Sequence, residues 1–94
     1  MSSKLRFSPE AREQYETLRD SPAQAKVWKA VRKALGFLEV NPRHASLKTH
    51  KYETLTRQMG VEVFEAYAQQ DIPGAYRIFW CYGPERGDIS VVMS

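Results

Sequence analysis

Residues 61–82 read VEVFEAYAQQDIPGAYRIFWCY, and this stretch determines the type of fold. β-Branched and aromatic residues dominate both of its ends, whereas residues 70–74 are mostly polar and include a Pro-Gly pair. This pattern predicts a β-hairpin with one strand over residues 61–69 and a second over residues 75–82. Successive side chains of a strand point to opposite faces, so the hairpin should have one apolar and one polar face.

The length of the predicted loop sets the register of this hairpin. A five-residue loop places Tyr67 opposite Arg77 and Ala66 opposite Ile78. One face then carries the more apolar side chains, which we expect to lie against helices: Phe64, Ala66, Ala68, Tyr76, Ile78 and Trp80. The other face presents an acid, a phenol and a guanidinium on an open surface, within the set Glu65, Tyr67, Arg77, Phe79 and Cys81.

Two helices are predicted before the hairpin. Residues 4–7 alternate polar and apolar side chains, as in a short strand, and Ser8 then caps a helix that ends near Arg19. A second helix is predicted over residues 22–39, with Ser21 as its N-cap, because apolar residues recur there at helical spacing.

A basic segment and a last strand complete the chain. Residues 43–57 hold four Lys or Arg and one acidic residue, and we expect irregular chain or a short turn there. Residues 88–93 predict a third strand after the hairpin. The order β-α-α-β-β-β indicates an α+β fold in which two N-terminal helices pack on one face of an antiparallel sheet. A chain of 94 residues fits one domain, covering residues 1–94.

Charge and cysteine content indicate the setting and the kind of partner. The formal net charge is +3, and the basic segment also holds both histidines, which makes a polyanion the natural partner. Cys81 is the only cysteine, so no internal disulfide can form. The sequence has no apolar run near 18 residues and no secretory leader. We therefore expect a protein of the reducing cytoplasm that does not enter the membrane.

The basic segment contains the residue types that metal-independent RNA cleavage requires. That reaction needs a base for the 2′-hydroxyl, an acid for the 5′-oxygen and cations at the phosphate. All three types occur within ten residues, in the set Arg43, His44, Lys48, His50, Lys51 and Tyr52. A solvated basic loop that binds an acidic partner, or nothing, explains the same residues.

Arg77 stands out because it interrupts the apolar pattern in the middle of a predicted strand. Its planar guanidinium suits a phosphate, or the charge that develops on a phosphorane. An ion pair with Glu65, or stacking on Tyr67, explains this arginine equally well. The functional and the structural interpretation can both hold.

The sequence does not support metal or cofactor chemistry. His44 and His50 are six residues apart, and with Cys81 as the only further soft ligand they match no zinc spacing. Cys81 lies between Trp80 and Tyr82 in a predicted strand, as expected of a packed thiol. The sequence has no glycine-rich phosphate loop. We therefore expect no metal site and no cofactor.

The order and spacing of these features resemble the RelE/ParE toxin superfamily of bacterial type II toxin-antitoxin systems. The second helix runs into Asn41-Pro42-Arg43, a Leu47-Lys48 turn follows, and residues 75–80 read AYRIFW. The stretches NPRHASLKTHKY and VFEAYAQ are similar to one branch of small RelE-like proteins. The resemblance extends over nearly the whole chain.

The resemblance implies a cognate antitoxin that wraps the toxin in a hetero-oligomer. It also implies one of two activities, because RelE-type members cleave mRNA in the ribosome without a metal ion and ParE-type members poison DNA gyrase. Arg77 falls where RelE-type enzymes place a phosphate-contacting arginine. Residues 63–67 contain no lysine where RelE has two, and the sequence ends at Ser94, before the tail in which RelE-type enzymes carry a tyrosine or histidine.

Our first hypothesis is therefore a toxin that inhibits translation as a ribosome-dependent mRNA endoribonuclease. In this hypothesis Arg77 stabilises transition-state charge, and His50 or Tyr67 carries protons. The residues expected to hold RNA and its phosphates are Arg43, His44, Lys48, Lys51 and Tyr52. The alternatives are a ParE-like gyrase inhibitor and an inactive member that only binds an antitoxin.

Overall fold

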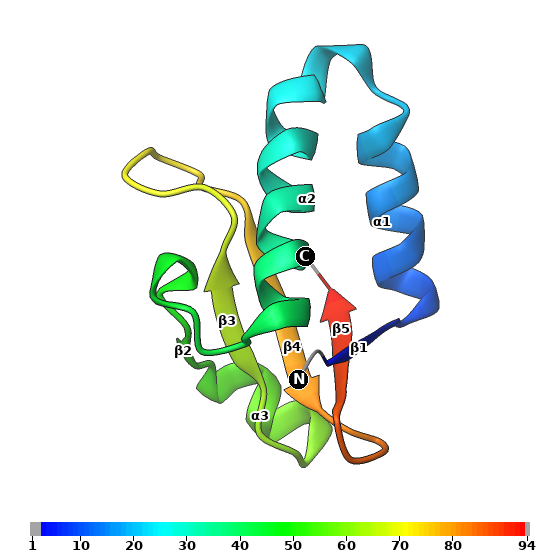
Figure 1. The fold of residues 1–94 in the computed structure, drawn as a ribbon, viewed down its shortest axis with the longest axis vertical. Helices are drawn as coiled ribbons and strands as arrows, with labels where there is room; N and C mark the ends of the chain where they lie inside the picture. The colour runs from blue at the N-terminus through cyan, green and yellow to red at the C-terminus, as the bar shows by residue number, and fades with distance from the viewer. Residues whose placement is uncertain (1–2, 94) are drawn as a thin grey trace.

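The computed structural model describes residues 3–93 and has an α+β architecture (Figure 1). Its helices are α1 Pro9–Arg19, α2 Ala25–Val40 and α3 Glu53–Met59. Its strands are β1 Lys4–Phe7, β2 His50–Lys51, β3 Phe64–Tyr67, β4 Arg77–Tyr82 and β5 Asp88–Met93. Two short 3-10 turns lie at Pro22–Gln24 and Ala45–Leu47. No helix within residues 3–93 is long and apolar enough to cross a membrane.

The five strands form one mixed sheet in the order β1-β5-β4-β3-β2. The sequence-based expectation of a fully antiparallel sheet is wrong at one edge, because β1 pairs with β5 in parallel. The helices α1 and α2 carry the chain away from the end of β1 and back again, as Figure 1 shows. The strands β3, β4 and β5 then alternate in direction, which leaves β5 running the same way as β1.

The central hairpin has the predicted register. Tyr67 is paired with Arg77 and Ala66 with Ile78 across β3 and β4. Both strands are shorter than predicted, since β3 spans only Phe64–Tyr67 and β4 starts at Arg77. The third strand, β5, has the predicted bounds.

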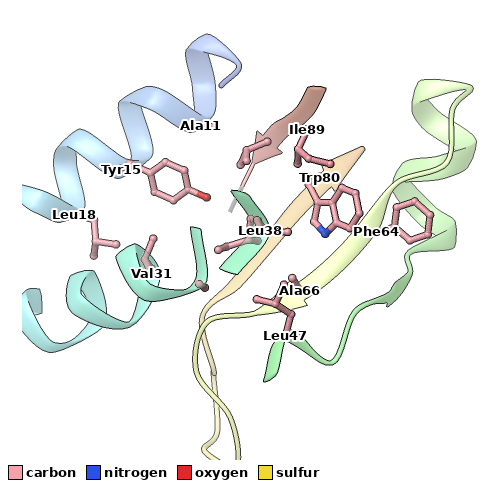
Figure 2. Close-up of a cluster of buried hydrophobic side chains, with 13 residues drawn as sticks. Ala11, Tyr15, Leu18, Val31, Leu38, Leu47, Phe64, Ala66, Trp80 and Ile89 are labelled. Atoms are coloured by element: carbon pink, nitrogen blue, oxygen red, sulfur yellow. The ribbon is translucent and has the colours of Figure 1, made fainter. Parts of the chain in front are cut away.

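The core lies between the helical pair and the predicted apolar face of the sheet (Figure 2). Trp80 and Ile78 of β4 are fully buried there, and Leu38 of α2 packs in the same cluster. Figure 2 shows Tyr15 of α1 directed toward the sheet and Leu18 of α1 beside Val31 of α2. The apolar alternation of the hairpin therefore determines which face the helices cover.

The two helices begin differently. The Ser8 side chain accepts a hydrogen bond from the Ala11 N–H at 3.0 Å, so the predicted cap of α1 is confirmed. The prediction for the second helix is wrong at its start, because a 3-10 turn occupies Pro22–Gln24 and Ser21 makes no side-chain capping bond. The α-helix begins only at Ala25, where the apolar periodicity starts.

The basic segment is more ordered than predicted, because it contains β2 and α3. The helix α3 is short and has no buried residue, so no apolar periodicity marks it in the sequence. Its order comes from hydrogen bonds to the chain before β3. Thr56 Oγ1 accepts from the Val63 N–H at 2.9 Å, and the Tyr52 N–H donates to the Val63 carbonyl at 2.7 Å. These contacts hold α3 against the chain before β3, and β2 pairs directly with β3.

Candidate functional site

A buried carboxylate lies on the sheet face that the helices leave uncovered. The side chain of Glu65, in β3, is only 3% exposed. Its Oε1 lies 2.7 Å from Nε2 of His50, and its Oε2 accepts a hydrogen bond from a terminal nitrogen of Arg77 at 2.7 Å. The Tyr67 hydroxyl donates to Oε1 at 3.4 Å. One acid therefore holds an imidazole, a guanidinium and a phenol together.

The pairing of three adjacent strands explains this convergence. His50 of β2 lies directly opposite Glu65, and Tyr67 of β3 lies directly opposite Arg77 of β4. Directly opposed residues of antiparallel strands put their side chains on the same face, as do residues two apart on one strand. The four side chains thus share a face by register alone, although they come from three elements.

Charge pairing makes the burial of Glu65 tolerable. An ionised carboxylate out of water is costly unless it is paired and hydrogen-bonded; Arg77 supplies the opposite charge, and Arg77 and His50 both lie within hydrogen-bonding distance of the Glu65 carboxylate. The partners themselves remain accessible, with the side chain of Arg77 47% exposed and that of His50 51% exposed. The guanidinium and the imidazole can therefore reach a ligand while the acid stays fixed behind them.

The orientation of the His50 ring is set by its contact with Glu65. Because Nε2 faces the Glu65 carboxylate, it carries a proton. The other ring nitrogen, Nδ1, lies 3.4 Å from the Lys48 carbonyl oxygen, and it can donate to that oxygen only when both ring nitrogens carry protons; in the neutral ring with its proton on Nε2, Nδ1 keeps its lone pair. A carboxylate that holds one imidazole nitrogen leaves the second to exchange a proton with a substrate, which is the usual arrangement of a general base.

Aromatic residues form the floor next to the charged cluster. The ring of Tyr52 lies 4.8 Å from the ring of Phe79, and the Arg77 guanidinium lies 5.7 Å from the same ring. Phe79 is buried, although the sequence placed it on an open face, because these two side chains flank it. Tyr52 thereby joins the cluster from the N-cap position of α3.

Five of the eight predicted site residues are close to one another in the structure. His50, Tyr67 and Arg77 meet at Glu65, Tyr52 packs beside them, and Lys48 precedes β2 with a left-handed backbone at φ 47°. Lys48 also shares with Tyr67 the lining of a surface hollow.

Three predicted site residues lie elsewhere. The guanidinium of Arg43 packs 4.7 Å from the ring of Phe64, whose side chain belongs to the core on the helix side. The His44 ring stacks at 4.2 Å on Phe37 of α2. Lys51 is opposite Phe64 in the register, and its ammonium lies 3.6 Å from Glu53 and 3.7 Å from Glu62. None of these contacts joins the three residues to the Glu65 cluster.

Glu65 is a central residue of this cluster that was not among the predicted site residues. The sequence named it only as an ion-pair partner of Arg77, and that ion pair is present. Its contact with His50 depends on β2, which was not predicted. The available signal was an acid within an apolar alternation, where an unpaired charge is unfavourable.

Two features bear on metal and thiol chemistry in the described part of the chain: the grouping of possible metal ligands and the burial of Cys81. Within residues 3–93, no group of three or more His, Cys, Asp or Glu side chains could hold a metal ion. Burial raises the pKa of the Cys81 thiol, which disfavours the thiolate needed for nucleophilic attack. The Glu65 cluster on the uncovered face presents an imidazole, a phenol, a guanidinium and a carboxylate.

The architecture defines a class of α+β proteins in which a helical pair covers one face of a five-stranded mixed sheet. Among solved structures, it is similar to "The structure of YoeB dimer from Staphylococcus aureus", with a TM-score of 0.64. The alignment covers 99% of this chain and 94% of the YoeB chain at 15% sequence identity, so the similarity is one of fold. No protein-family model matches the sequence, and no curated protein matches it.

Proposed function

We propose that this protein is the toxin of a type II toxin-antitoxin system and that it cleaves ribosome-bound mRNA without a metal ion. The fold supports the first part, since YoeB is a RelE-family toxin. The observation that carries the second part is the cluster in which Glu65 holds His50, Arg77 and Tyr67 on an uncovered sheet face. In this proposal the single toxin domain acts in the cytoplasm and is neutralised by an antitoxin in a hetero-oligomer.

The cluster contains the groups that 2′-hydroxyl attack requires. In this proposal Nδ1 of His50 takes the proton of the 2′-hydroxyl while the 2′-oxygen bonds to phosphorus. Arg77 donates to the non-bridging oxygens as negative charge develops on them. The bond to the 5′-oxygen then breaks, and Tyr67 supplies the proton that this leaving group needs. The products are a 2′,3′-cyclic phosphate and a 5′-hydroxyl.

The other predicted residues have less direct roles in this proposal. Lys48 contacts a neighbouring phosphate, and Tyr52 supports Arg77 through their shared contact with Phe79. Arg43, His44 and Lys51 contact Phe64, Phe37 and Glu53 rather than Glu65, and in this proposal they belong to the surface that meets the ribosome or the antitoxin. The residues that act on the phosphate are thus separate from those that bind the ribosome or the antitoxin.

The experiment uses purified ribosomes programmed with a defined message. The wild-type protein is compared with Arg77→Ala, and with Arg86→Ala as a matched control, since Arg86 is an exposed arginine in the turn between β4 and β5. New 5′ ends within the message are mapped by primer extension, and the 3′ ends are tested for a cyclic phosphate. We expect cleavage by the wild type and by Arg86→Ala, and loss of at least about 100-fold in rate with Arg77→Ala.

Three outcomes would contradict all or part of this proposal. Intact messages together with double-strand DNA breaks in the presence of gyrase would assign the protein to the gyrase inhibitors. Intact messages, intact DNA and normal growth on induced expression would leave a protein that only binds an antitoxin. Equal cleavage by the wild type and Arg77→Ala would remove Arg77 from the chemistry.

A further inference from the structure

Two adjoining surface hollows lie beside the Glu65 cluster, at the loop between β3 and β4. One has a volume of about 470 Å³ and the other about 440 Å³. Both are lined by Tyr67, Ile72 and Ala75; the first also reaches Lys48, and the second reaches Arg77. Because they share these three residues, we treat them together as one site, which we call the loop groove; a cation lines each of its two parts.

The loop that forms one wall of this groove is tied down at several points. The Gln69 side chain accepts a hydrogen bond from the Tyr76 N–H at 3.1 Å, and the Tyr76 carbonyl accepts from the Ala68 N–H at 3.0 Å. Further along, the Gln70 amide donates to the Ser46 carbonyl in the turn before Lys48. The groove therefore exists without a ligand, which lowers the entropic cost of filling it.

The lining has the chemistry of a nucleotide site. The Tyr67 phenol is an aromatic surface on which a base can stack, and Ile72, which is 50% exposed, offers an apolar edge facing the same space. Gln70 and Asp71 add an amide and a carboxylate that can bond to the polar edge of a base. Lys48 lines one part of the groove and Arg77 the other, so each part offers a cation to a phosphate.

We propose that the loop groove binds the base of the nucleotide next to the cleaved phosphate and that Tyr67 and Ile72 determine which bases are accepted. This inference rests on the proposed function, because Arg77 is the cation that links the groove to the reacting phosphate. Tyr67 then has two separate parts: its ring binds the base, and its hydroxyl, 3.4 Å from Glu65, takes part in proton transfer.

A binding measurement tests the groove without requiring cleavage. Fluorescein-labelled 2′-O-methyl oligonucleotides of A, U or C lack the attacking hydroxyl, so they report binding alone by fluorescence anisotropy. We expect Tyr67→Leu to weaken binding at least about five-fold, and Tyr67→Phe to bind like the wild type because it keeps the ring. Ile72→Ala should weaken binding about three-fold and change the ranking of the oligonucleotides.

Val61→Ala is the matched control for Ile72→Ala, because Val61 is 49% exposed and does not line the groove. We expect it to bind like the wild type. The inference is overturned if no oligonucleotide binds, or if Tyr67→Leu and Ile72→Ala bind as tightly as the wild type. Tighter competition by an acidic peptide than by any oligonucleotide would also overturn it, since the groove would then fit a protein partner.

The cleavage assay separates this inference from the proposed function. If ribosome-bound messages stay intact while Ile72→Ala still weakens oligonucleotide binding, base binding by the loop groove is supported and the ribonuclease proposal is contradicted. If the wild type and Ile72→Ala cut messages at the same bases and bind oligonucleotides equally, the ribonuclease proposal is supported and base binding by the loop groove is contradicted. A shift in the bases at the cut sites, confined to the groove variants, supports both.

Discussion

Nε2 of His50 lies 2.7 Å from Oε1 of Glu65, although the two residues belong to different strands. The same carboxylate holds Arg77 through its other oxygen, also at 2.7 Å. This single acid therefore joins β2, β3 and β4 on the face that carries the candidate chemistry. Variants of Glu65 should consequently affect both the stability of the sheet and the activity.

Glu65→Ala should lower the free energy of unfolding by about 1–3 kcal/mol, because it removes the charged hydrogen bonds that hold His50 and Arg77. Chemical denaturation with urea measures the change. Glu62→Ala is the control, since the Glu62 side chain is 66% exposed and its contact with Lys51 is 3.7 Å long, and it should cost less than about 0.5 kcal/mol. If Glu65→Ala and Glu62→Ala lowered the free energy of unfolding by the same small amount, the contacts of Glu65 would not contribute to stability.

Ser8→Ala should destabilise the protein by about 1–2 kcal/mol. The Ser8 hydroxyl accepts from the Ala11 N–H at 3.0 Å and donates to the Val92 carbonyl at 2.8 Å, so it both caps α1 and ties it to β5. Ser21→Ala should leave the urea midpoint nearly unchanged, because Ser21 makes no side-chain capping bond. A larger loss from Ser21→Ala than from Ser8→Ala would contradict this assignment of caps.

Asp88 should make stability depend on pH in the acid range. The hydrogen bond from Nε of Arg6, at 2.6 Å, is the main cause that holds the pKa of Asp88 below its ordinary value, and the Glu85 N–H also donates to it. Because the pKa is lower in the folded chain than in the unfolded chain, where it is about 4, this stabilisation is present above about pH 4. It is lost as the pH falls through the folded-state value.

Urea midpoints between about pH 7 and pH 3 test this dependence. Asp88→Asn should be less stable than the wild type at neutral pH, and the difference should shrink as the pH falls below about 4. Glu13→Gln, at an exposed position of α1, should follow the wild type throughout. A difference between the wild type and Asp88→Asn that stays constant across the whole range would rule out Asp88 as its source.

Ile78→Val should cost about 0.5–1.5 kcal/mol, because Ile78 is fully buried between the sheet and the helices and the lost methylene leaves a small cavity. Ile72→Val makes the same chemical change at a side chain that is 50% exposed, and its effect on the urea midpoint should be near zero. If the two variants were equally destabilised, the assignment of the buried face would be wrong.

Two lysines of the basic segment should contribute unequally to RNA binding. Lys48 is exposed and lines the loop groove, whereas the ammonium of Lys51 is near the carboxylates of Glu53 and Glu62. Lys48→Ala should weaken the binding of a 2′-O-methyl oligonucleotide and reduce the slope of log affinity against log salt by about 0.7. Lys51→Ala should leave that slope unchanged, and a reversed order would place the RNA on the other face.

Local patterns in the sequence were sufficient to predict the hairpin and the first helix. The alternation of residues 61–82 and the length of its loop predicted that Tyr67 faces Arg77, which the structure confirms. The same alternation indicated that Glu65 shares their face. These features depend on strand periodicity, loop length and the capping of one N–H group, all of which act over a few residues.

The tertiary structure alone decided the rest of the site. The sequence does not mark β2 and α3, because their order comes from hydrogen bonds with Val63 and from strand pairing rather than from apolar periodicity. Only this pairing brings His50 to Glu65, while stacking on Phe37 and Phe64 takes His44 and Arg43 to the helix side. A charged residue has no periodicity that fixes its position, so its partner is known only once distant segments have packed.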